Sequence, residues 1–156
     1  MTPENTPHKE NDPLRGKRVL IVDDDICNVF CFEETLKHLS NRNNLNLTIF
    51  TAHSGKEALK LLESGETIDL LVTDCNMGEK SGPRLIGDIK ALSLKKGFEY
   101  LASMAIIMAS ARFYADSAEK QAQEYGADTG FAKPVNPKIV FEKAREIFRS
   151  RLQKAT

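Results

Sequence analysis

The chain has 156 residues, in which 22 lysine and arginine residues are balanced by 22 aspartate and glutamate residues. This length suits a single domain with a substantial core. Because the charges balance and no segment is strongly basic, the composition argues against direct binding to nucleic acid. The apolar runs are short and the N-terminal residues are polar, so we expect neither a membrane span nor a signal peptide.

The cysteines, Cys27, Cys31 and Cys75, are too few for a disulfide framework. Reduced thiols and a cytoplasmic location are therefore expected. Cys27, Cys31 and His38 fall on one predicted helix, where three points spread along the axis make a poor metal site. Buried or half-buried thiols are the preferred interpretation.

Residues 1–16 combine prolines with polar side chains and have no apolar period. This composition predicts a flexible leader. The expected organisation is a leader over residues 1–16, one domain over residues 17–152 and a short tail over residues 153–156.

Short apolar segments recur along the chain and predict strands. The first, residues 19–22, has no polar alternation, which is typical of a strand covered on both faces. The predicted strands are residues 19–22, 47–52, 68–73, 104–109 and 129–132.

Each predicted strand is followed by apolar residues at helical spacing. Ser54 with Glu57 has the spacing of a capping box, and Asn136 followed by Pro137 is a typical helix start. The polar connection from Ser93 predicts a surface loop before the fourth strand. The residues that mark the helices are, helix by helix, Val29, Phe32, Leu36 and Leu39; Ala58, Leu61 and Leu62, expected inward; Leu85, Ile89 and Leu92; Ala118, Ala122 and Tyr125; and Val140, Ala144, Ile147 and Phe148, expected inward.

Strict alternation of strands and helices predicts an α/β fold, with a parallel sheet covered by helices on both faces. In such sheets ligands bind beyond the carboxyl ends of the strands. Polar residues gather at those ends: Asp23, Asp24 and Asp25 after the first strand, Asp74 after the third, Ser110 after the fourth and Lys133 after the fifth.

This convergence predicts a site for Mg²⁺, which prefers oxygen ligands and binds phosphate-bearing substrates. With a cation present, Asp74 becomes a plausible nucleophile towards a phosphoryl group, and Lys133 can hold a phosphoryl oxygen. Each residue also has a simpler interpretation. The aspartates can cap helices, Ser110 can be an ordinary strand-end hydroxyl and Lys133-Pro134 can be a turn.

The segments VLIVDDD, SGKEAL, DLLVTDCNMGEKSG, IIMASA and GADTGFAKP occur in this order. Together they resemble a response-regulator receiver domain, over about residues 17–152. The resemblance implies a flavodoxin-like, doubly wound sheet of five parallel strands in the order 2-1-3-4-5. It also implies transfer of a phosphoryl group from a histidine kinase or histidine phosphotransfer protein, followed by altered binding of a downstream protein.

The resemblance assigns a role to each matching residue. Asp74 matches the phosphoacceptor, which is also a metal ligand, while Ser110 and Lys133 match the hydroxyl and ammonium that bind the phosphoryl group. For Mg²⁺ it implies Asp24 as a direct ligand, Asp23 as an acid acting mainly through water, and the backbone carbonyl of Asn76. Asp25 is expected to start the first helix. Two further matches are Gly82, eight residues after the acceptor, and Pro134, usually a cis proline.

The chain departs from the family pattern at two positions. Met77-Gly78 replaces the usual methionine-proline, which predicts a looser loop. Gly130 stands where the family usually carries an aromatic residue that swings inward on activation. We therefore expect phosphorylation to reach partners through another route, the loop 112–114 beside Ser110. Phe113 and Tyr114 in this loop are either packing residues or a docking surface.

Two other functions remain open at this point. One is a docking module that keeps the fold without phosphotransfer, against which the acid, hydroxyl and lysine set counts. The other is a Mg²⁺-dependent phosphatase with an aspartyl-phosphate intermediate. Such enzymes of the haloacid-dehalogenase type place two aspartates as Asp-x-Asp on one strand end, whereas Asp74 stands alone after its strand. A non-enzymatic signalling role is therefore expected.

Overall fold

A computed structural model of the protein describes residues 11–155. Five parallel strands form one sheet in the order β2-β1-β3-β4-β5, which confirms the predicted fold class and strand order. The strands are β1 (Arg18–Val22), β2 (Thr48–Ala52), β3 (Leu70–Asp74), β4 (Ala105–Ser110) and β5 (Thr129–Ala132).

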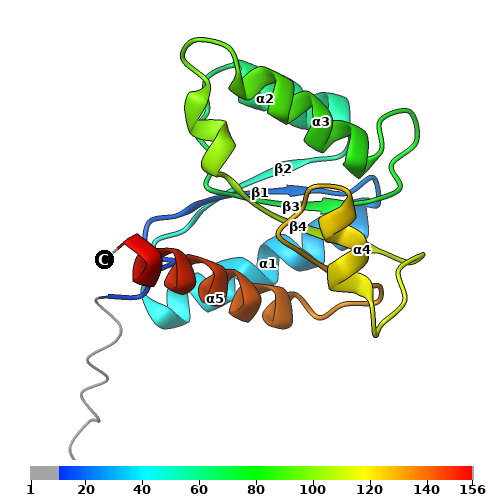
Figure 1. Cartoon of the computed structure of the whole chain (residues 1–156). Helices are drawn as coiled ribbons and strands as arrows, with labels where there is room; N and C mark the ends of the chain where they lie inside the picture. The colour runs from blue at the N-terminus through cyan, green and yellow to red at the C-terminus, as the bar shows by residue number, and fades with distance from the viewer. Residues whose placement is uncertain (1–10, 156) are drawn as a thin grey trace, which may run out of the picture.

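Helices cover both faces of the sheet, with α2 and α3 on one side and α1 and α5 on the other (Figure 1). The core is accordingly split into two apolar clusters, one on each face of the sheet. The helices are α1 (Ile26–Asn43), α2 (Gly55–Glu63), α3 (Gly82–Ser93), the short 3-10 helix η1 (Glu99–Ser103), α4 (Ala118–Glu124) and α5 (Pro137–Ala155).

Two strands extend further towards the site than predicted. Asp74 is the last residue of β3 and Ser110 the last residue of β4, rather than the first residues beyond them. The reason is hydrogen bonding between strands, since Asp74 pairs with Ala109 and Ser110 with Ala132. The sheet itself therefore holds the backbone of both residues.

The folded domain begins before the expected boundary at Lys17. Leu14 is 1% exposed and belongs to the cluster beneath α1 and α5. Asp12 forms an ion pair with Arg145 of α5 at 3.0 Å. Residues 11–16 are thus packed against the domain, whereas residues 1–10 of the predicted leader lie outside the described part. At the other end α5 continues through residues 153–155 of the expected tail.

The connection between α3 and β4 contains more regular structure than predicted. It contains η1, where Leu101 is buried and Tyr100 donates a hydrogen bond to the carbonyl of Glu66. The expected surface loop is therefore confirmed for residues 94–97, which are exposed, while Leu101 of η1 packs into the core.

The prediction of buried or half-buried thiols is also wrong for two of the cysteines. Cys27 and Cys31 are exposed, because α1 turns Val29, Leu36 and Leu39 towards the sheet; Cys75 is buried. Tyr125, which marks the predicted fourth helix, is the C-cap residue of α4 and is 48% exposed.

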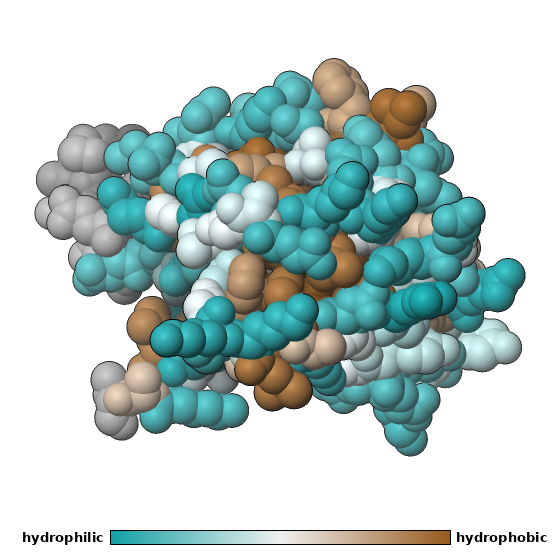
Figure 2. All heavy atoms as spheres, turned by 90° about the horizontal axis from the view of Figure 1, so that it is seen from above, coloured by the Kyte–Doolittle hydropathy of each residue, from teal (hydrophilic) through white to brown (hydrophobic). Residues whose placement is uncertain are grey.

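The outer surface agrees with a folded domain whose apolar side chains are mostly internal. The face seen from above α2 and α3 is mainly hydrophilic, with hydrophobic residues in small areas (Figure 2). Within residues 11–155 no helix has the length and apolar character needed to cross a bilayer.

Replacing Leu14 by alanine tests whether the N-terminal turn belongs to the domain. Because the side chain is buried, we expect the free energy of unfolding to fall by about 2–4 kcal/mol, measured by urea denaturation. Leu94→Ala is the matched control, since Leu94 is 88% exposed and its removal should change stability by less than about 0.5 kcal/mol. Equal effects of the two substitutions would contradict the packing of this turn.

Candidate functional site

The site lies at the carboxyl edge of the sheet, where the neighbouring strands β1, β3, β4 and β5 end. Val22 pairs with Thr73, so the following residues, Asp23 and Asp74, stand side by side. The ends of β4 and β5 add Ser110 and, directly after β5, Lys133. The structure therefore brings together residues that are up to 110 positions apart in the chain.

Three carboxylates form the acidic part of the site. Asp23, Asp24 and Asp74 each offer an oxygen atom within 4.8 Å of the others. Asp23 and Asp74 are buried and Asp24 is exposed. An open cluster of hard oxygen ligands suits Mg²⁺, which retains several waters when bound to proteins. The residues present therefore fit the predicted metal ion.

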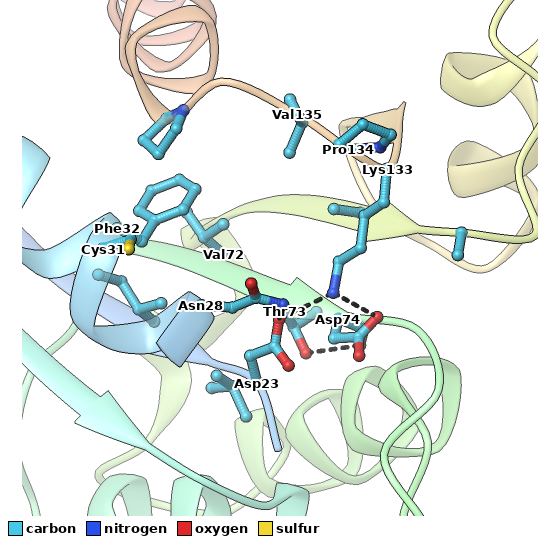
Figure 3. Close-up of a pocket in the computed structure, with 15 residues that line it drawn as sticks. Asp23, Asn28, Cys31, Phe32, Val72, Thr73, Asp74, Lys133, Pro134 and Val135 are labelled. Carbon is cyan, nitrogen blue, oxygen red and sulfur yellow. Dashed lines mark hydrogen bonds and ion pairs between the residues drawn. The ribbon is translucent and has the colours of Figure 1, made fainter. Parts of the chain in front are cut away.

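Lys133 bridges the two buried acids. Its ammonium nitrogen lies 2.8 Å from Oδ2 of Asp23 and 3.3 Å from Oδ1 of Asp74. Figure 3 shows the side chain reaching across the pocket from the end of β5 to both carboxylates. The Lys133-Pro134 peptide bond is cis, as the family resemblance implies.

Burial and the neighbouring charges shift the pKa values of Asp74 and Lys133. Burial raises the pKa of Asp74, and the charge of Asp23 raises it further, against the opposing effect of Lys133. Burial lowers the pKa of Lys133, but hydrogen bonds and charge from Asp23 and Asp74 outweigh it and raise the pKa overall. Lys133 is therefore held in its charged form, while ionisation of Asp74 is less favourable than that of an aspartate in water.

The three consecutive aspartates have different surroundings. Asp25 caps α1, since its side chain accepts hydrogen bonds from the backbone of Cys27 and Asn28, as expected. Asp23 accepts a hydrogen bond from the backbone N–H of Asp25 at 2.9 Å and one from the side-chain amide of Asn28 at 3.5 Å. Sequence reasoning missed Asn28, because nothing in its own type distinguishes it from other polar residues in a first helical turn.

Ser110 is completely buried beside the acids. Its hydroxyl oxygen accepts hydrogen bonds from the backbone N–H of Arg112 at 3.1 Å and from the side-chain amide of Asn76 at 3.3 Å. Its carbonyl accepts one from the backbone N–H of Lys133. Ser110 is thus tied to the loop after β3 and to the end of β5.

Two glycines shape the loop that follows Asp74. A Cβ atom at Gly82 would lie 2.3 Å from the carbonyl oxygen of Asp74, so only glycine lets the start of α3 approach this strand end. Gly78 has φ +61°, a conformation that proline cannot adopt. Met77 beside it is 4% exposed. With Gly78 in place of the usual proline, the backbone takes a path that proline could not follow. The buried side chain of Met77 anchors this path.

An apolar cavity of about 390 Å³ adjoins the acids. Asp23, Asp74 and Lys133 line its polar end. Figure 3 shows Phe32 and Val135 on the side of the cavity away from the carboxylates. The carboxylates therefore sit at the border between an apolar wall and solvent.

Gly130 has no room for a side chain. A Cβ atom there would lie 2.3 Å from the Cβ of Ala122 and 2.9 Å from the carbonyl oxygen of Ala118, both in α4. Helix α4 therefore occupies the space that an aromatic side chain at position 130 would need.

Phe113 and Tyr114, which could each be a packing residue or part of a docking surface, differ in burial. Phe113 is 8% exposed and its ring stacks on Tyr125 with centroids 6.4 Å apart, so it is a packing residue. Tyr114 is 71% exposed.

Comparison with known proteins agrees with this geometry. The profile of the response regulator receiver domain matches residues 19–145. A chemotaxis protein CheY homologue of Campylobacter jejuni is 29% identical over 131 residues, which cover 83% of this chain and 91% of that protein. The virulence sensor protein BvgS of Bordetella pertussis is 34% identical over 93 residues, 60% of this chain and 7% of that protein.

Solved structures share the fold. The chemotaxis response regulator CheY4 of Vibrio cholerae superposes with a TM-score of 0.65 at 22% identity, covering 85% of this chain and 98% of the other. Since the family profile spans most of the chain, the chain belongs to the response regulator receiver domain family.

Proposed function

We propose that the protein receives a phosphoryl group on Asp74 from the phosphohistidine of a histidine kinase or histidine phosphotransfer protein, and that this changes its binding to a downstream protein. The observation that carries the proposal is the bridge from Lys133 to both Asp23 and Asp74, with Asp24 within 4.8 Å of them. A nucleophile, a cation and further metal ligands thus meet at one accessible edge of the sheet.

The transfer step follows from the positions of these groups. A carboxylate oxygen of Asp74 forms a bond to phosphorus while the bond from phosphorus to the histidine nitrogen breaks, and the imidazole leaves. Lys133 then holds one phosphoryl oxygen and the Ser110 hydroxyl donates a hydrogen bond to another. Asp23, Asp24, Asp74 and the backbone carbonyl of Asn76 would hold Mg²⁺, which supplies positive charge beside the phosphoryl group.

Receiver domains are signalling modules, and the proposed product stays attached to the chain. The protein would therefore act as a phosphorylated switch rather than as an enzyme that turns over a free substrate. A cytoplasmic location is part of the same proposal, because the free thiols Cys27, Cys31 and Cys75 suit a reducing compartment. The balanced charge favours a protein partner over nucleic acid.

Incubation with Mg²⁺ and acetyl phosphate tests the phosphoacceptor directly. We expect one acid-labile phosphoryl group per chain by intact-mass spectrometry, absent from Asp74→Asn. Asp25→Asn is the matched control, since Asp25 is an aspartate of the same run that caps α1 and asparagine caps equally well. No mass gain in the wild type would support a phosphorylation-independent docking module, and steady release of phosphate from a panel of phosphate monoesters would support a phosphatase.

Metal binding is tested by stability. Mg²⁺ at ten times its dissociation constant should raise the free energy of unfolding of the wild type by about 1.4 kcal/mol, because only the folded chain presents the site. Asp24→Asn should lose most of this gain and Asp25→Asn should keep it. A Mg²⁺-independent urea midpoint in the wild type would exclude the metal site.

The burial of Asp74 predicts a pH-dependent effect of Asp74→Asn with divalent ions removed by chelation. Because burial raises the pKa of Asp74, ionisation of this group opposes folding, so the substitution should raise the free energy of unfolding at neutral pH. The penalty is present above the raised pKa and absent below the unfolded value, so the gain should vanish below about pH 3.5. Asp116→Asn, at an exposed position, should show neither effect in urea denaturation.

A further inference from the structure

The apolar cavity beside the acidic site is open to solvent between α1 and the segment that leads into α5. Exposed residues of both segments line it, namely Asn28 and Cys31 on α1 and Pro134 after β5. Its volume of about 390 Å³ lies within the range of sites that hold small organic molecules. The cavity is therefore both large enough and accessible enough for such a ligand.

Most of the cavity wall is apolar. Phe32 of α1, Val72 of β3 and Val135 after β5 line it, and Figure 3 shows Phe32 and Val135 away from the carboxylates. A protein-bound Mg²⁺ keeps several waters and gains nothing from such a wall. The cavity thus extends beyond what the metal ion would use, and its extension suits an apolar body.

The polar end of the cavity carries an excess of negative charge. Asp23 and Asp74 line it together with Lys133, whose ammonium lies near both. Oδ1 of Asp74 accepts a hydrogen bond from the backbone N–H of Cys75 and faces Lys133. Oδ2 of Asp74 receives no hydrogen bond from residues 11–155, although this aspartate is only 8% exposed. A buried acceptor without a donor favours a ligand that brings one.

We propose that the cavity binds a small organic cation, a primary amine attached to a compact aromatic or branched aliphatic body. The ammonium donates to Oδ2 of Asp74 and opposes the charge of Asp23, while the apolar body packs against Phe32 and Val135. Two carboxylates face one ammonium in this wall, so a cation is favoured over a neutral or anionic ligand. The proposal rests on the cavity and its charges and does not require phosphotransfer.

Three probes test the ligand class, with divalent ions removed by chelation and binding followed by NMR. Naphthylmethylamine should bind about tenfold more tightly than naphthylmethanol, because the alcohol has the same shape but makes no charge-assisted hydrogen bond. Butylamine should bind about tenfold more weakly than naphthylmethylamine, because it buries less apolar surface. Equal affinities for the naphthyl amine and alcohol, or a dissociation constant of the amine above about 5 mM, would overturn the proposal.

Two variants separate this ligand from the metal ion. Val135→Trp fills the apolar part of the cavity and should weaken naphthylmethylamine binding about tenfold, while the Mg²⁺ effect on the urea midpoint persists. Asp24→Asn should do the reverse, since Asp24 belongs to the acidic cluster but does not line the cavity. Ile139→Trp is the matched control for the added ring, because Ile139 is 54% exposed and lies outside the cavity. Equal losses of amine binding in the two tryptophan variants would contradict the assignment.

Alkylation of the cysteines gives a second measurement that needs no variant. Cys31 lines the cavity, whereas Cys27, one helical turn earlier in α1, does not; both are exposed. A saturating concentration of naphthylmethylamine should slow the reaction of Cys31 with iodoacetamide by about threefold and leave that of Cys27 unchanged, as followed by mass spectrometry. If both thiols slow alike, or neither slows, the amine does not bind in this cavity and the proposal fails.

Discussion

The repulsion between two buried carboxylates governs this end of the molecule. Two unit charges about 4 Å apart repel by roughly 4 kcal/mol at an effective dielectric of 20, so Asp23 and Asp74 at adjacent strand ends need a nearby cation. Lys133 supplies it from the end of β5, at 2.8 Å and 3.3 Å. A further cation beside Asp23, Asp24 and Asp74 would relieve the same repulsion.

The precision of the site comes from the sheet. Pairing of Asp74 with Ala109 and of Ser110 with Ala132 fixes the two backbones relative to each other. Gly82 then allows α3 to begin against the carbonyl of Asp74. The reactive groups therefore rest on strands, while the loops that carry Met77 and Arg112 surround them. A rigid base with adaptable loops is the arrangement expected of a binding site.

The packing of α4 depends on the absence of a side chain at position 130. Gly130 lets α4 lie on β5, and the same helix contacts the turn after Ser110 through Tyr125 and Gln121. A side chain at position 130 would force the helix and the strand apart, because its Cβ would lie 2.3 Å from the Cβ of Ala122. The turn after Ser110 and α4 are thus packed together close to the acidic site.

The sequence by itself determined the α/β class, the strand order through the family motifs, and the convergence of Asp23, Asp74, Ser110 and Lys133, because periodicity and strand-end positions are local properties. It did not reveal that Leu14 is buried, that Cys31 is exposed or that Asn28 contacts Asp23. The packing of α4 on Gly130 was equally hidden. These features depend on which segments meet in space, and only the tertiary structure decides the distances between residues far apart in the chain.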